Sequence, residues 1–247
     1  MTDSILETKQ LSKKFGEFVA VDSVDMTVEI DEIKGLIGPN GAGKTTFFNL
    51  VTGNLTPTGG QIWFKDTDIT GAPPHEIPRL GLSATFQITS VFPELTVKKN
   101  MLGSILGEQK LLSPIRSYGT DPEQNKKIRE VLSLIDLEES LNRTVGNLSH
   151  ADQKILEIGI ALAADPDLLF LDEPTAGLSA SETNAVRALL NDLRGEVTII
   201  LIEHDMDLVM DTVDSLTVLH NGSIVAEGTP QQIRSNERVQ EIYFGRN

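Results

Sequence analysis

Apolar and polar residues alternate along this chain in a way that predicts strands separated by helices. Strand-like apolar runs stand at Ile33–Ile37, Leu168–Asp172 and Val197–Ile202, and a helical pattern follows the second of them at Ala180–Leu193. Another short helix is expected from Asp205. Strands that alternate with helices are typical of βαβ units, so this part of the chain predicts a mainly parallel sheet.

Two other regions have the pattern of antiparallel pairing. Near the beginning, the runs Ile5–Leu11, Val24–Ile30 and Gln61–Phe64 are short and strand-like. Near the end, Leu216–His220 and Ile224–Glu227 flank Asn-Gly, the strongest short signal for a two-residue hairpin turn. We therefore expect a small antiparallel sheet at the start and a hairpin close to the C-terminus.

The middle of the chain has a different character, because it contains helical patterns and no convincing strand. Helices are expected at Val97–Leu106, Asp121–Leu134 and His150–Ala164. The least regular stretch, Glu108–Gly119, lies between the first two of these helices. Roughly residues 88–164 thus form a helical insert within an α/β core.

The composition places the chain among soluble globular proteins, since 39% of its 247 residues are hydrophobic and 23% are charged. Its 21 basic and 36 acidic side chains leave a net charge of −15, which argues against nucleic-acid partners and against direct adhesion to anionic lipid. The absence of cysteine excludes disulfides, thiolate zinc sites and a cysteine nucleophile. With no signal-peptide pattern or spanning apolar run, we expect a cytosolic protein.

A glycine-rich segment, GPNGAGKTT, follows the strand at 33–37 and opens a helix expected at 43–51. It matches the phosphate-loop pattern G-x-x-x-x-G-K-S/T, in which glycines let successive backbone N–H groups converge on a phosphate. The lysine supplies a positive charge to the β- and γ-phosphates, and the hydroxyl that follows binds Mg²⁺. The expected nucleotide-binding residues are Gly38, Pro39, Asn40, Gly41, Ala42, Gly43, Lys44, Thr45 and Thr46.

A second motif, LLFLDEP, ends the strand at 168–172 with two acids. The carboxyl ends of parallel strands are where α/β sheets bind ligands. Asp172 is therefore a candidate Mg²⁺ ligand, and Glu173 is a candidate general base that orients the attacking water. Together with the phosphate loop, this pair predicts a nucleoside triphosphatase.

Between these motifs lies LSHADQ, residues 148–153, and the order of all the motifs resembles the ATP-binding subunit of ABC transporters along nearly the whole chain. The resemblance implies a P-loop NTPase (RecA-like) α/β core with an N-terminal antiparallel β subdomain and an inserted helical subdomain. One ABC ATPase domain would span 1–247, with its nucleotide-binding core at 1–87 and 165–247 and its helical signature subdomain at 88–164.

The resemblance also assigns roles to single residues. Ser149, at a helix N-cap, would face the nucleotide of a partner subunit, so that two ATP molecules are sandwiched in a dimer. Gln87 would reach Mg²⁺ or the water, and His204 would contact the γ-phosphate as the switch histidine. Phe15 would stack on adenine.

Two positions depart from the family's usual pattern. Ala151 stands where glycine is most frequent in the signature, and it adds a methyl group where backbone normally approaches a γ-phosphate. Ser179 replaces the usual aspartate at the end of the loop that follows the hydrolytic strand, and it also begins a capping box with Glu182.

Segments such as DEPTAGLS, EHDMDLVM and AEGTP resemble importers of branched-chain amino acids, with urea or short-amide importers as the alternative. The implied partners are a second ATP-binding subunit, identical or paralogous, transmembrane permease subunits and, indirectly, a solute-binding protein. The chain would lie on the cytoplasmic face of the membrane, held there by the permeases. Two other classes stay open, a soluble ABC-type ATPase outside transport and a nucleotide-gated interaction module with little turnover.

Overall fold

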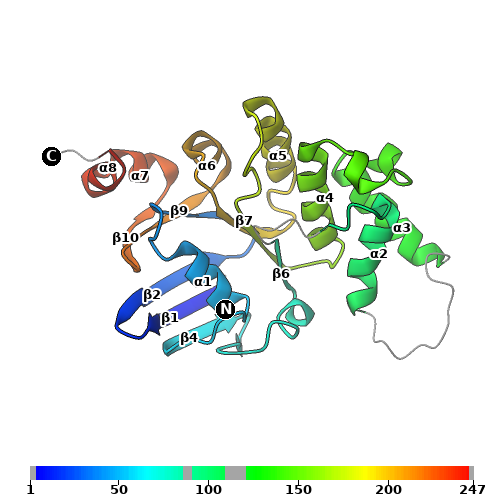
Figure 1. Cartoon of the computed structure of the whole chain (residues 1–247). Coiled ribbons are helices and arrows are strands. Elements are labelled where there is room, and N and C mark those ends of the chain that lie inside the picture. The colour runs from blue at the N-terminus through cyan, green and yellow to red at the C-terminus, as the bar shows by residue number, and fades with distance from the viewer. Residues whose placement is uncertain (1–3, 86–90, 109–120, 245–247) are drawn as a thin grey trace.

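The computed structural model describes residues 4–85, 91–108 and 121–244. Two β-sheets and the helices packed on them form the fold, with most of the helices on one side of the larger sheet (Figure 1). The helices are α1 (Lys44–Val51), α2 (Val97–Glu108), α3 (Pro122–Leu134), α4 (His150–Leu162), α5 (Ala180–Asp192), α6 (Met206–Thr212), α7 (Pro230–Ser235) and α8 (Glu237–Phe244).

The larger sheet has six strands, and most of its pairs are parallel. Its members are β3 (Ile33–Ile37), β6 (Leu82–Thr85), β7 (Leu168–Asp172), β8 (Thr198–Ile202), β9 (Ser215–His220) and β10 (Ser223–Gly228). They lie in the order β10-β9-β3-β8-β7-β6, and only the β9–β10 pair is antiparallel. The carboxyl ends of the five parallel strands therefore share one edge, where a ligand site is expected.

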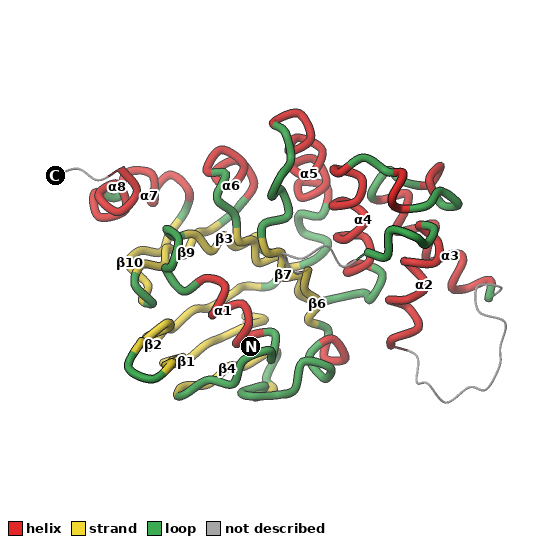
Figure 2. The backbone as a smooth tube through the Cα atoms, viewed as in Figure 1, coloured by secondary structure: helices red, strands yellow, loops and turns green. Residues whose placement is uncertain are grey.

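The smaller sheet is antiparallel and lies below the larger one in the view of Figure 2. Its strands are β1 (Ser4–Phe15), β2 (Phe18–Glu29), β4 (Gly59–Phe64) and β5 (Thr67–Asp68), in the order β2-β1-β4-β5. Helix α1 lies between the two sheets (Figure 1). This arrangement puts the helix that follows the phosphate loop inside the protein.

The large sheet separates two hydrophobic cores, because successive side chains of a strand point to opposite faces. Leu169 and Leu171 of β7 belong to the core shared with α4, α5 and α6, whereas Phe170 belongs to the core shared with α1 and the small sheet. There the ring of Phe48 meets that of Phe170 edge-on at a centroid distance of 4.8 Å. Both faces of the parallel strands are thus buried, as their unbroken apolar runs predict.

Most of the expected elements are present, and the α/β class with a parallel sheet and an antiparallel N-terminal sheet is confirmed. In the described part of 88–164 there is no strand, only an isolated bridge between Thr96 and Thr144. The strands β1 and β2 are longer than predicted because pairing carries them through polar and exposed positions up to their turn. Helices α7 and α8 were not predicted, although Thr229-Pro230 followed by Gln232 forms a capping box.

No helix in the described ranges is long and apolar enough to cross a membrane.

Candidate functional site

Three of the predicted motifs meet at the carboxyl edge of the parallel sheet. The phosphate loop leaves β3, Asp172 is the last residue of β7, and His204 lies just beyond the end of β8. β3 and β7 both pair with β8, so the three strand ends are neighbours. The topology therefore brings together three motifs that are far apart in the sequence.

Two glycines of the phosphate loop, Gly38 and Gly43, are required by close backbone neighbours. A Cβ atom on Gly38 would lie 2.3 Å from the carbonyl oxygen of Leu219, and one on Gly43 would lie 2.4 Å from that of Ala20. Gly43 also has a φ of 107°, which favours glycine, and it forms the N-cap of α1. The loop is thus shaped by the strands around it, and it leads into the N-terminus of α1, where N–H groups without helical partners can bind an anion.

Lys44 is buried at the foot of this loop, with 6% of its surface exposed. Its ammonium group donates hydrogen bonds to the carbonyl oxygens of Gly38 at 2.7 Å and Pro39 at 3.3 Å. Burial lowers the pKa of Lys44, while the charges of Glu173 and Asp172 act in the opposite direction. The lysine is therefore held at the loop, where it can place a positive charge on a bound phosphate.

Asp172 and Glu173 create a concentration of negative charge at the end of β7. Burial, and next the charge of Glu173, raise the pKa of Asp172 to about 6, against the opposing effects of Lys44 and His204. Among the described residues, no group of three or more His, Cys, Asp or Glu side chains is arranged to hold a metal ion. A cation bound by Asp172 would therefore need ligands from the hydroxyl of Thr45 and from the nucleotide itself.

Glu173 is fixed by its backbone as well as by its side chain. Its φ is 51°, in the left-handed region, and its N–H donates to the carbonyl oxygen of Ile202 at 2.9 Å. Its Oε1 lies 2.8 Å from Nε2 of His204, and the two side chains are 20% and 44% exposed. Strained backbone with a paired, accessible acid is typical of a catalytic position.

Ser149 caps α4, as predicted, and its hydroxyl accepts the N–H of Asp152 at 3.0 Å. The serine is exposed, whereas Ala151 in the first turn is buried. Helix α4 packs in the core on the face of the large sheet opposite α1. The N-terminus of α4 and the phosphate loop of the same chain thus belong to different layers.

The remaining predicted residues have different outcomes. Thr45 is exposed at the start of α1. Phe15 is 48% exposed at the turn between β1 and β2, and β2 passes directly beside Gly43 of the phosphate loop. The ammonium group of Lys13 lies 5.1 Å from the centre of the Phe15 ring. Gln87 lies outside the described residues.

Sequence reasoning missed two polar residues beside this site. Glu203 is buried between Ile202 and His204, and it binds Thr175 by two hydrogen bonds. A buried strand that ends in an acid, the signal that pointed to Asp172, is also present in LIEHD. Tyr243 of α8 was missed as well; burial raises its pKa to about 12, and the backbone of Gly38 is its hydrogen-bond partner.

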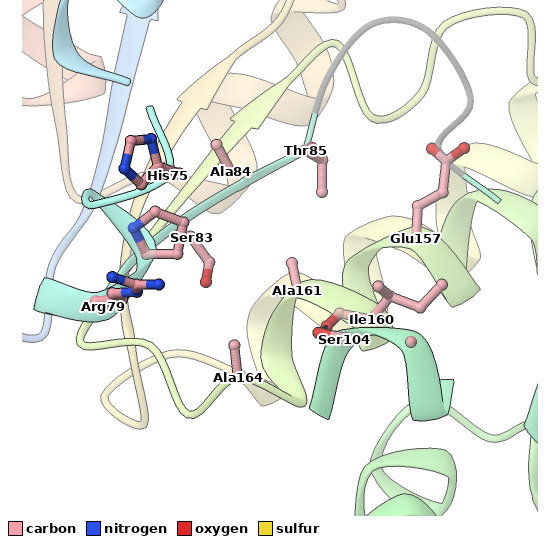
Figure 3. A pocket seen from close by; sticks show the side chains of 12 residues that line it. His75, Arg79, Ser83, Ala84, Thr85, Ser104, Glu157, Ile160, Ala161 and Ala164 are labelled. Atoms are coloured by element: carbon pink, nitrogen blue, oxygen red, sulfur yellow. Dashed lines mark hydrogen bonds between the residues drawn. The ribbon is translucent and has the colours of Figure 1, made fainter. Parts of the chain in front are cut away.

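A groove lies between β6 and the helices α2 and α4 (Figure 3). Its volume is about 390 Å³, and it ends at Thr85, the last described residue before the segment that contains Gln87. Charged side chains stand at its two ends, Arg79 on one side and Glu157 on the other, with Ala161 between them. The groove thus runs along the border between the parallel sheet and the helices of the middle region.

The fold and the phosphate loop together define a P-loop nucleoside triphosphatase. Residues 21–176 match the family described as ABC transporter, and residues 223–247 match the family described as branched-chain amino acid ATP-binding cassette transporter. The chain belongs to the ABC transporter family. It is accordingly an ATP-binding subunit with ATPase activity, of the kind that works with permease subunits.

Curated relatives match over almost the whole chain. The high-affinity branched-chain amino acid transport ATP-binding protein BraF of Pseudomonas aeruginosa is 40% identical and covers 99% of each chain. LivG of Escherichia coli, with the same description, is 40% identical at the same coverage. A probable LivG of Archaeoglobus fulgidus is 35% identical, covering 98% of this chain and 95% of that protein.

Solved structures agree with this assignment. An ATP-binding cassette of an ABC transporter in its ADP conformation has a TM-score of 0.89 and 33% identity, covering 99% of this chain and 100% of that chain. A nucleotide-free cassette has a TM-score of 0.86 and 32% identity, covering 98% and 100%. The predicted fold class and the predicted family are therefore confirmed.

Proposed function

We propose that this chain powers an importer of branched-chain or other hydrophobic amino acids by hydrolysing ATP. The observation that carries the proposal is the match of residues 223–247 to the branched-chain cassette family, a segment that contains α8 and ends the chain. The names of the full-length relatives support the same substrate class over urea and short amides. The working site is the cytoplasmic face of the membrane, where the permeases hold the subunit.

ATP binding falls to the phosphate loop and to the β1–β2 turn. The N–H groups of residues 38–46 and the dipole of α1 receive the β- and γ-phosphates, and Lys44 adds its charge. The exposed ring of Phe15 offers a stacking face for adenine. Phe15 immediately precedes the turn into β2, and β2 lies beside Gly43 of the phosphate loop. Gln87, which lies outside the described residues, is proposed to reach Mg²⁺ or the attacking water.

Mg²⁺ fits the donors that the site presents. Asp172 is a buried carboxylate whose pKa is raised by burial and by Glu173, so a divalent cation there relieves an unfavourable charge. The hydroxyl of Thr45 and the amide of Gln87 are the further proposed ligands. When bound, the ion neutralises charge on the phosphate oxygens.

Hydrolysis is assigned to Glu173 with the help of His204. The carboxylate of Glu173 accepts a proton from the attacking water and orients it, while His204 holds that carboxylate by the contact of 2.8 Å. His204 is also accessible enough to contact the γ-phosphate, since 44% of its side chain is exposed.

Ser149 is proposed to act on the nucleotide of a second ATP-binding subunit. Ser149 is exposed at the N-terminus of α4, where helix N–H groups can bind an anion. This helix end lies in a different layer from the phosphate loop of the same chain, so a nucleotide from another subunit can occupy it. Two subunits, identical or paralogous, then enclose two ATP molecules. In this arrangement residues 88–164 act as one signature subdomain, and residues 1–87 and 165–247 as the nucleotide-binding core.

The groove of Figure 3 is proposed to receive a permease segment. It is bordered by the sheet edge that leads toward Gln87 and by α4, the helix that Ser149 caps. A segment seated there would therefore contact β6 and the C-terminal half of α4. A solute-binding protein acts indirectly, through the permeases.

Deletion of the gene in its natural host tests the transport assignment. Uptake of radiolabelled leucine should be lost and should return with the wild-type gene but not with a Glu173→Gln copy. Urea and acetamide uptake serve as the comparison substrates. Loss of urea or acetamide uptake with normal leucine uptake would replace the substrate assignment, and normal uptake of all three would contradict the transport role.

A further inference from the structure

A buried carboxylate, Glu203, joins the two loops that carry Glu173 and His204. Only 4% of its surface is exposed, and it follows directly on the last residue of β8. Burial of a charge is costly unless hydrogen bonds replace the lost hydration. Its negative charge also contributes to the raised pKa of Asp172, so its presence next to two other acids needs an explanation.

Both oxygens of Glu203 are occupied by the protein. Oε1 accepts the N–H of Thr175 at 2.8 Å and its hydroxyl at 2.6 Å, and Oε2 accepts the N–H of His204 at 3.0 Å. Three charge-assisted hydrogen bonds offset the free-energy cost of burying this carboxylate. The geometry is that of a clamp between two loops, since each oxygen already has a protein donor.

The clamp is one of three links between the loop after β7 and the loop after β8. The others are the bond from the Glu173 N–H to the carbonyl oxygen of Ile202 at 2.9 Å and the contact of 2.8 Å between Glu173 and His204. Thr175 opens the stretch 175–179, which ends at Ser179, the N-cap of α5. Glu203 thus ties the stretch beyond Glu173 to the backbone that holds the histidine.

We propose that Glu203 is a positioning residue for ATP hydrolysis: through Thr175 it fixes the Glu173 loop against His204, so that the acid and the histidine keep one geometry. The proposal rests on the proposed roles of Glu173 and His204. The phosphate loop packs against the backbone of Ala20 and Leu219, and neither residue belongs to this linkage. Loss of the clamp should therefore lower kcat and leave the affinity for MgATP unchanged, because misplacement of a reacting group by about 1 Å costs large factors in rate.

The test uses the full chain and a series of variants at both ends of the clamp. Glu203→Gln keeps an acceptor for Thr175 but turns one oxygen into a donor that faces the N–H of His204. Thr175→Val removes the hydroxyl, and Thr175→Ser keeps it. We expect kcat to fall about tenfold in Glu203→Gln and in Thr175→Val, with KM for MgATP within about twofold of the wild type.

Two features of the result separate positioning from general stability. Thr175→Ser should restore kcat, and the double variant should lose no more than the worse single variant, because both changes break one linkage. Thr217→Val is the matched control: that buried hydroxyl donates to Glu227 Oε1 at 2.7 Å, in a Thr–Glu pair between β9 and β10. It should lower the melting temperature with normal kcat.

The proposal is overturned if folded Thr175→Val has normal kcat, if KM rises in step with the fall in kcat, or if Thr217→Val slows turnover equally. Should Glu203→Gln fail to fold, the Thr175 pair of variants decides alone. Glu173→Gln is measured in parallel. If it turns over normally, the proposed catalytic role of Glu173 fails, whereas normal kcat in the Thr175 variants together with an inactive Glu173→Gln removes only the role of Glu203.

Discussion

Nε2 of His204 lies 2.8 Å from Oε1 of Glu173, although the residues are 31 positions apart in the sequence. Their proximity follows from the parallel pairing of β7 with β8, in which Asp172 is opposite Ile202. Each residue lies one or two positions beyond its strand, so the sheet register brings the acid and the imidazole to neighbouring strand ends. A change of register by one residue would turn these side chains to the other face.

Replacement of the acid tests its proposed role most directly. Glu173→Gln keeps the shape of the side chain and its contact with His204 but removes the proton acceptor. We expect kcat to fall by at least about 100-fold, since general base catalysis contributes about 10²–10⁴. Binding of MgATP, measured by calorimetry, should persist, and size-exclusion chromatography should show an ATP-bound dimer.

The matched control is Glu196→Gln, because Glu196 is an exposed acid in the turn before β8. It should have wild-type kcat. Turnover of Glu173→Gln at the wild-type rate would remove the carboxylate from the reaction and would leave the nucleotide-binding role of the phosphate loop intact.

The raised pKa of Asp172 predicts how the nucleotide-free protein responds to pH. Burial raises the pKa of this carboxyl in the folded state to about 6, above its usual value of 3.8, so folding favours the protonated form. Stability from this group is complete below about pH 4 and is lost as the pH rises through 6. Asp172→Asn should therefore raise the melting temperature at pH 8, by about 2–4 °C for each kcal/mol gained.

That gain should shrink as the pH falls toward 5, where the wild-type carboxyl becomes protonated. Calorimetric melting of both proteins without nucleotide or Mg²⁺ at pH 5, 6, 7 and 8 measures the trend. Asp66→Asn, at an exposed position in the turn between β4 and β5, is the control and should show no such trend. A gain that is constant over this range would contradict the raised pKa of Asp172.

Local signals made the phosphate loop and the helix caps predictable from the sequence. Gly43 and Lys44 stand at fixed spacing in one short segment, and a cap such as Ser149 depends on a partner three residues away. Asp121 caps α3 by accepting the N–H of Glu123, two residues away. Such features need only a few consecutive residues, so the sequence contains all the information that they use.

Contacts between residues that are far apart in the chain could not be predicted from the sequence. The tie of Glu203 to Thr175 spans 28 positions, and it depends on where two strands end. The packing of Tyr243 beside Gly38 depends on two helices, α7 and α8, whose amphipathic patterns are short. Register and packing decide these contacts, and a single sequence gives no direct measure of either.

Filling the groove of Figure 3 should uncouple transport from ATP hydrolysis. Ala161 of α4 lines the groove, so Ala161→Phe places a ring where the permease segment is proposed to sit. We expect leucine uptake by cells to fall at least about fivefold, with the ATPase rate of the isolated subunit unchanged, since a lost contact of 1 kcal/mol reduces binding about fivefold. Ala188→Phe, at an exposed position of α5, is the control. Normal uptake with Ala161→Phe would exclude this groove as the docking site.

The location of Ser149 predicts complementation between two inactive subunits. In a sandwich dimer, each site combines the phosphate loop of one chain with Ser149 of the other, because α4 and α1 pack on opposite faces of the large sheet. Lys44→Ala and Ser149→Arg should each abolish turnover alone, and an equal mixture should regain activity from the one site that keeps both residues. The mixture of Lys44→Ala with Glu173→Gln is the control. In that mixture one chain has the intact phosphate loop and the other has the intact Glu173, so neither site has both. Mixtures that stay inactive, although tagged subunits copurify with ATP, would place Ser149 outside the partner's site.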